Sequence, residues 1–87
     1  MGSASRAKPE RLAEKLLAIR ETLRLVQTDL AEALSDDRQR VSKSDVSRFE
    51  LGLREPSPLI LLRYARLAKL NMELLIDDEL DLPKRFQ

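Results

Sequence analysis

Residues 41–57, with the sequence VSKSDVSRFELGLREPS, carry the side chains whose types and spacing matter most for function. On a helix over residues 42–50, Val46 and Phe49 would turn inward at i,i+3 spacing. Four hydrogen-bonding side chains would lie on the outward side: Lys43, Ser44, Ser47 and Arg48. One face of this helix would therefore anchor it, and the other would recognise a partner.

Both ends of this helix are marked by local signals. Ser42 is suited to be the N-cap, and Asp45 supplies the acidic half of a capping box three residues later. Gly52 follows the last inward residue, where a helix commonly ends on a left-handed residue that glycine adopts without steric cost. Ser57 followed by Pro58 indicates the start of a new helix.

The elements that position these residues are predicted from apolar spacing, which indicates an all-α chain of five helices. They cover residues 10–23, residues 27–34, residues 42–50, residues 58–70 and a short helix with Asn71 as its N-cap. The residues expected to face the core of these helices are Leu12, Leu16, Ile19, Leu23, Leu30, Ala31, Leu34, Leu59, Leu61, Leu62, Ala65, Ala68, Met72, Leu75 and Ile76, with Tyr64 at the core edge.

The boundaries between these elements predict one domain over residues 10–82. Residues 1–9 are expected to be a flexible arm or a cloning leader. Residues 83–87 are expected to be a tail, because Pro83 discourages further helix, with Phe86 free to dock on a neighbour. Residues 35–40 form a long connection, which either lengthens the second helix or changes the angle of the third.

The composition excludes several classes of function. The chain of 87 residues lacks cysteine and histidine, which removes disulfides, thiol and histidine catalysis and the usual zinc sites. No enzyme activity, cofactor or metal is therefore expected. The longest apolar run, residues 59–62, is too short to span a membrane, so a cytoplasmic protein is expected. The net charge of +1 leaves nucleic-acid binding undecided.

The segments QTDLAEAL and SRFELGLREPS closely resemble the helix-turn-helix of the lambda repressor and Cro family, also called the Xre family. The resemblance covers residues 12–76 and implies a compact five-helix domain in which helices two and three form the motif. Two features depart from the family pattern. Val26 stands where a capping Ser, Thr or Asn is usual, and the long connection over residues 35–40 replaces a tight glycine turn.

The resemblance implies a sequence-specific DNA-binding transcriptional regulator, a repressor that reads the major groove with the helix over residues 42–50. Arg54 would grip phosphate. The DNA-binding residues it implies are Gln27, Thr28, Arg38, Arg40, Lys43, Ser44, Ser47, Arg48 and Arg54. It also implies a structural ion pair between Arg20 and Glu50, a near-palindromic operator in double-stranded DNA and a homodimer.

A second function remains open: a protein-interaction module or antitoxin-like partner that keeps the fold without specific DNA binding. Its contact surface would be the long connection over residues 35–40 together with the acidic C-terminal segment, formed by Asp77, Asp78, Glu79 and Asp81. Leu80 and Leu82 would be the apolar anchors of this segment for a second copy or for another protein, because phosphate would repel the carboxylates.

Overall fold

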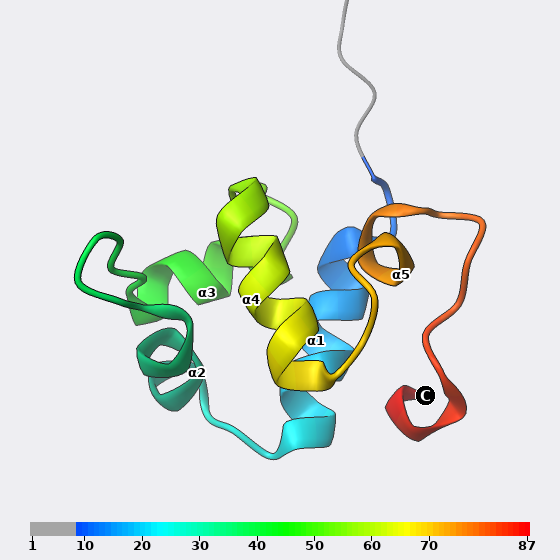
Figure 1. Ribbon diagram of the computed structural model, residues 1–87, viewed down its shortest axis with the longest axis horizontal. Helices are drawn as coiled ribbons and strands as arrows, with labels where there is room; N and C mark the ends of the chain where they lie inside the picture. The colour runs from blue at the N-terminus through cyan, green and yellow to red at the C-terminus, as the bar shows by residue number, and fades with distance from the viewer. Residues whose placement is uncertain (1–8) are drawn as a thin grey trace, which may run out of the picture.

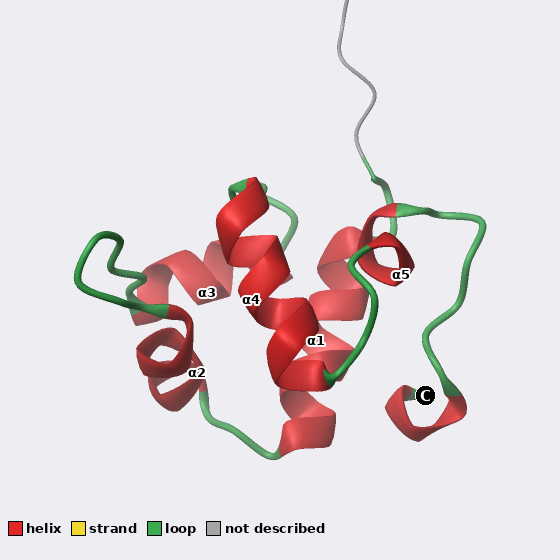
Figure 2. Ribbon diagram, viewed as in Figure 1, coloured by secondary structure: helices red, strands yellow, loops and turns green. Residues whose placement is uncertain are grey.

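A computed structural model describes residues 9–87, and all regular structure within this range is helical (Figures 1 and 2). The elements are α1 (Leu12–Leu23), α2 (Gln27–Leu34), α3 (Lys43–Glu50), α4 (Pro58–Ala68), α5 (Glu73–Ile76) and the 3-10 helix η1 (Lys84–Phe86). The predicted all-α class with five α-helices is confirmed. Of the arm predicted for residues 1–9, all but Pro9 lies outside the described residues.

Helix α1 is the element against which most of the others pack, whereas α2 packs against α3 and α4. Helix α1 contacts α3, α4, α5 and η1, and Figure 1 shows α2 and α3 on one side of it and α5 and η1 on the other. Leu16 and Ile19 on its inner side are fully buried. The helix begins two residues later than predicted, because Arg11 has a non-helical conformation (φ −96°, ψ 1°) and its amide and that of Glu10 donate to Asp78.

Helix α4 ends at Ala68, before the predicted residue 70, because Lys69 adopts the left-handed conformation (φ 58°). The prediction for its inner face was wrong at one position: Leu59 is 45% exposed and Ile60 is buried in its place. Leu62, also expected in the core, is half-buried. Positions 60, 61, 64, 65 and 68 form the buried stripe, and residue 59 lies one position outside it.

Tyr64 was expected at the core edge, but its side chain is fully buried at the centre of α4. No atom of the described residues forms a hydrogen bond with its hydroxyl group. Burial raises the pKa of this phenol, with a smaller contribution from the negative charge of Glu50. The neutral form is therefore the one that the core holds.

Helix α5 is a single turn, and Asn71 is not its N-cap. Met72 occupies that position with helical angles (φ −58°, ψ −30°), and no side chain caps the helix. Leu75 is fully buried, whereas Ile76, also expected in the core, is 41% exposed. Consecutive residues of a helix point about 100° apart, so a single turn that buries Leu75 directs Ile76 outward.

The C-terminal residues belong to the fold, although a tail was predicted after residue 82. Pro83 precedes η1 instead of preventing helical structure, and Phe86 is buried in the core of this chain rather than free to dock on a neighbour. Leu82, the predicted anchor for a partner, is also buried, and Leu80 is half-buried. Truncation after Ile76 would therefore remove part of the core as well as any contact with a partner.

Two acidic residues of this segment bind the start of α1. Asp78 accepts hydrogen bonds from the amides of Glu10 (2.8 Å) and Arg11 (3.1 Å), and Asp81 forms an ion pair with Arg11 at 2.7 Å. The amide hydrogen bonds from Glu10 and Arg11 lower the pKa of Asp78. The C-terminal segment thus fastens the first turn of α1, far away in the sequence.

These contacts predict a loss of stability in acid. A carboxylate whose pKa is depressed by folding stabilises the protein fully above its unfolded pKa, and the contribution disappears as the pH falls through the lower folded value. We expect the free energy of unfolding to fall below about pH 4, and Asp78→Asn to flatten this dependence. Urea unfolding between pH 2 and 6 measures both. If the free energy of unfolding falls equally with pH in the parent and in Asp78→Asn, Asp78 does not stabilise the fold through its charge.

Candidate nucleic-acid interface

Helix α3 is fixed at both ends by the residues predicted from the sequence. The hydroxyl of Ser42 accepts from the amide of Asp45 (3.0 Å), and the carboxylate of Asp45 accepts from the amide of Ser42 (2.9 Å). This reciprocal pair is the expected capping box. Gly52 has φ 74° just after the helix, as expected for a left-handed end.

The two faces of α3 are sharply different. Val46 is fully buried and Phe49 is 4% exposed, so the inner face is anchored in the core. The predicted recognition residues occupy the remaining surface of the helix: Lys43, Ser44 and Arg48 are exposed, and Ser47 is half-buried. The fold therefore presents two cations and two hydroxyl groups together on one short, capped helix.

The expected ion pair between α1 and α3 is formed. The guanidinium of Arg20 donates twice to the carboxylate of Glu50, from Nε to Oε2 (2.6 Å) and from Nη2 to Oε1 (3.0 Å), and once to the carbonyl of Leu25 (3.0 Å). The side chain of Glu50 is 5% exposed and that of Arg20 is 18% exposed. The hydrogen bonds to Glu50 raise the pKa of Arg20. This pair sets the position of α3 relative to α1.

At the start of α2, fewer side chains are available to contact DNA than the sequence predicted. Gln27, expected at DNA, donates from Nε2 to Oε1 of Glu50 (3.0 Å), so its side chain completes the buried ion pair. Thr28 is exposed in the first turn. Val26 provides no side-chain cap, and its side chain is 61% exposed. Thr28 and the free backbone amides at this helix start are the groups that remain available to a phosphate.

The long connection between α2 and α3 is an ordered loop, and α2 still ends at Leu34. The hydroxyl of Ser35 donates to the carbonyl of Ala31 (2.8 Å) and accepts from the amide of Val41 (2.7 Å). Val41 is itself buried, so the chain re-enters the core directly before α3. The residues between these anchors project at the edge of the molecule (Figure 1).

Asp36 organises the inside of this loop. Its carboxylate accepts from the amides of Arg38 (2.9 Å) and Gln39 (2.8 Å), and these backbone bonds lower the pKa of Asp36. Arg63 from α4 forms an ion pair with Asp36 and donates to the carbonyl of Leu34 (2.7 Å). The base of the loop is thereby attached to α4, a contact for which the spacing of the residues gave no signal.

Two arginines of the loop were predicted to contact DNA. Arg40 lies 3.5 Å from Glu32 in an ion pair whose two side chains are 69% and 71% exposed. Arg38 is exposed, and its side chain forms no ion pair with any described residue. Both cations therefore lie at the surface beside the entry to α3.

Arg54 also has a partner that the sequence did not indicate. Its Nη1 donates to Oδ1 of Asp45 at 2.7 Å, and its guanidinium carbon lies 5.9 Å from the centre of the Phe49 ring. Arg48 approaches the same carboxylate oxygen at 3.7 Å. The sequence indicated only a capping function for Asp45. Arg54 lies beyond Gly52, where the helix has already ended, so helical spacing gave no indication of this ion pair.

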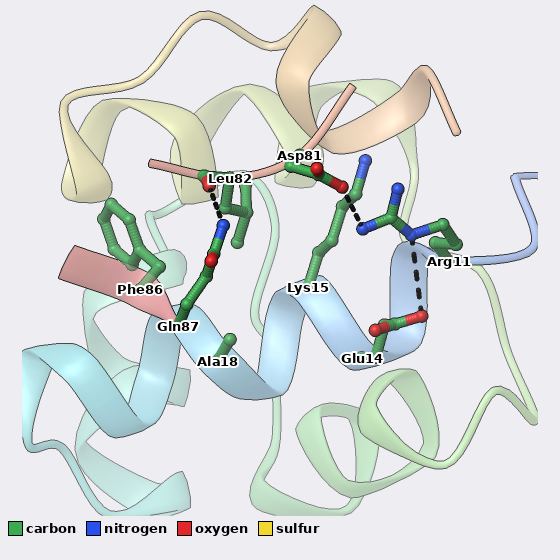
Figure 3. Close-up of a pocket in the computed structure, with 8 residues that line it drawn as sticks. All are labelled: Arg11, Glu14, Lys15, Ala18, Asp81, Leu82, Phe86 and Gln87. Carbon is green, nitrogen blue, oxygen red and sulfur yellow. Dashed lines mark hydrogen bonds and ion pairs between the residues drawn. The ribbon is translucent and has the colours of Figure 1, made fainter. Parts of the chain in front are cut away.

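A second candidate site is the groove of about 340 Å³ between α1 and the C-terminal segment. Figure 3 shows its eight residues, and the polar groups bind one another. Arg11 lies between Asp81 (2.7 Å) and Glu14 (3.7 Å), and Gln87 donates to the carbonyl of Leu82 (2.7 Å). This groove joins two parts of the fold and leaves few polar groups for a ligand.

Lys15 in the wall of this groove is unusual among residues 9–87, because it is a charged residue that is only 2% exposed. Its ammonium group donates to the carbonyls of Leu74 (2.8 Å), Asp77 (2.9 Å) and Leu80 (2.8 Å). Burial is the main cause that lowers the pKa of Lys15. Its three donors are all used by the end of α5 and the turn that follows.

Within residues 9–87, no three His, Cys, Asp or Glu side chains are grouped as a metal site would require, and no helix is long and apolar enough to cross a membrane.

The chain matches no family model, no curated protein and no solved structure. Among the described residues, the face of α3 with its exposed Lys43, Ser44 and Arg48 is the best-defined candidate for a functional surface.

Proposed function

We propose that this protein is a sequence-specific DNA-binding transcriptional regulator of the lambda repressor and Cro type, and that it acts as a repressor in the cytoplasm. The observation that supports the proposal is the anchored helix α3. Val46 and Phe49 hold its inner face in the core, while its outer face carries Lys43, Ser44, Ser47 and Arg48. The positions of these four side chains relative to a groove would be set by the fold.

In this function α2 and α3 act as a helix-turn-helix, with α3 in the major groove. Lys43 and Arg48 would donate to O6 and N7 of guanine, and Ser44 and Ser47 would bind either type of base. The phosphate contacts would come from groups around α3, namely Thr28, Arg38, Arg40, Arg54 and the amides at the start of α2. Two copies bound as a homodimer would read a near-palindromic operator, with their reading helices about 34 Å apart.

A selection from random oligonucleotides tests this reading of bases. We expect Lys43→Ala and Arg48→Ala each to weaken binding to the selected operator by about 1–3 kcal/mol and to relax the preference at one base pair. Lys84→Ala is the matched control, because it removes the same charge from η1, on the other side of α1 from α3 (Figure 1). The proposal would be contradicted if the parent and both variants, Lys43→Ala and Arg48→Ala, selected the same DNA sequence.

One observation favours the second candidate, a protein-interaction module or antitoxin-like protein. Leu51 and Leu53 follow α3 directly and are 67% and 74% exposed, a composition more typical of a protein contact than of a phosphate contact. Binding to random duplex DNA at two salt concentrations separates the two functions. A steep fall in affinity with salt is expected from phosphate contacts and not from an apolar protein surface.

A further inference from the structure

Asp45 is placed to affect DNA binding in a way that its capping function does not require. Its Oδ2 accepts the amide of Ser42, and its other oxygen, Oδ1, lies 2.7 Å from Arg54 and 3.7 Å from Arg48. One carboxylate therefore faces two of the cations proposed to bind DNA. The amide hydrogen bond from Ser42 is the largest of the causes that lower the pKa of Asp45, so the carboxylate is charged near neutral pH.

The position of Arg54 shows what this contact does to the cation. Arg54 lies beyond Gly52 on the turn after α3, yet its side chain folds back along the helix to reach Asp45 near the first turn. Its guanidinium group also lies 5.9 Å from the centre of the Phe49 ring. Arg54 is thus directed toward α3 and paired, although its side chain remains 57% exposed.

We infer that Asp45 weakens sequence-independent DNA binding by holding Arg54 on α3, an inference that rests on the proposed function. A carboxylate and a phosphate compete for the same guanidinium group, since both accept its donors in similar geometry. When Arg54 moves to a phosphate it must leave Asp45, which then stands as a negative charge near the DNA without its closest ion-pair partner. Asp45 is accordingly a positioning residue. It lowers the affinity of the protein for DNA, whatever the base sequence.

The exposure of Arg54 keeps this control adjustable, since its side chain is 57% exposed whereas that of Asp45 is 21% exposed. Solvent screens an ion pair that has an exposed partner, so a phosphate can displace Asp45 without a large loss elsewhere. The same exposure makes the expected effect of removing Asp45 modest and measurable. Asn at this position keeps an oxygen that can accept the amide of Ser42, so Asp45→Asn removes the charge while the geometry of the cap is retained.

The test measures binding to a random-sequence DNA duplex at several salt concentrations. We expect Asp45→Asn to bind about fivefold more tightly than the parent, and its salt slope to be steeper by about one phosphate contact. Asp37→Asn is the matched control for the change in charge, because Asp37 lies in the loop before α3 and forms no ion pair with any described residue. Its affinity should change by less than about twofold.

Adding Arg54→Ala identifies the released cation. The double variant Asp45→Asn with Arg54→Ala should bind the duplex no more tightly than Arg54→Ala alone, and with no steeper salt slope. An equal gain in Asp37→Asn, no gain in Asp45→Asn, or a gain that survives Arg54→Ala would overturn the inference. If Asp45→Asn does not fold, Asp45→Gln replaces it, since Gln is an established capping-box residue.

Binding by the parent protein distinguishes a failure of the inference from a failure of the proposed function. If the parent binds the duplex with a clear salt dependence and Asp45→Asn gives no gain, the inference fails and the proposed function stands. If neither the parent nor any variant binds duplex DNA at low salt, the proposed function fails, and the inference fails with it.

Discussion

Replacing Glu50 by alanine should lower the free energy of unfolding by about 3–5 kcal/mol. The substitution removes a carboxylate that is 5% exposed and accepts three hydrogen bonds, two from Arg20 and one from Gln27. The guanidinium of Arg20 would remain largely buried with one carbonyl partner, that of Leu25. A largely buried charge that loses its partner is far more costly than the intact pair is stabilising.

Urea unfolding followed by circular dichroism measures this loss, and Arg20→Ala should give an effect of similar size. The matched control is Glu32→Ala, which breaks the ion pair with Arg40 between two side chains about 70% exposed. Its expected cost is about 0–1 kcal/mol, because solvent screens such a pair. If Glu50→Ala and Arg20→Ala both unfold like the parent, the pair does not hold α3 on α1.

Lys15→Met should destabilise the protein by about 3–5 kcal/mol. Methionine preserves most of the length and the apolar stem of lysine, so the difference isolates the ammonium group. Its loss would leave the carbonyls of Leu74, Asp77 and Leu80 without the donor that they share. These bonds join α1 to α5 and the turn that follows it, so their loss should loosen that side of the fold. Figure 3 shows Lys15 pointing from α1 toward the C-terminal segment.

Hydrogen exchange locates the effect of this substitution, and urea unfolding gives its size. The amides at the end of α5 and in η1 should exchange faster in Lys15→Met than in the parent. Lys84→Met, at an exposed lysine of η1, should change the stability by less than about 0.5 kcal/mol. Equal stability of Lys15→Met and the parent would mean that water satisfies these carbonyls as well as the ammonium group does.

The sequence alone determined the features that depend on neighbours within one or two turns. The capping box of Ser42 and Asp45, the left-handed Gly52 and the Ser57–Pro58 helix start all form as predicted, because each is a local interaction of backbone and adjacent side chain. The inward faces of α1, α2 and α3 were also predictable, since apolar residues at helical spacing have few other places to go.

The Arg20–Glu50 pair is a different case, because it was expected from the family resemblance and not from the spacing of the residues. These two side chains lie thirty positions apart in the sequence. Nothing in either local segment indicates the partner. The pair forms, while the family resemblance over residues 12–76 and the DNA-binding function that it implies stay predictions.

The tertiary structure alone decided how distant polar groups pair and which apolar side chains fill the last part of the core. Gln27 turns to Glu50, Arg54 turns to Asp45, and Lys15 is buried among three carbonyls. Phe86 completes the core where a tail was expected. The physical reason is that all four contacts depend on where the chain places helices and turns relative to one another. The three polar side chains are long, and each binds the group that this placement brings within about 3 Å.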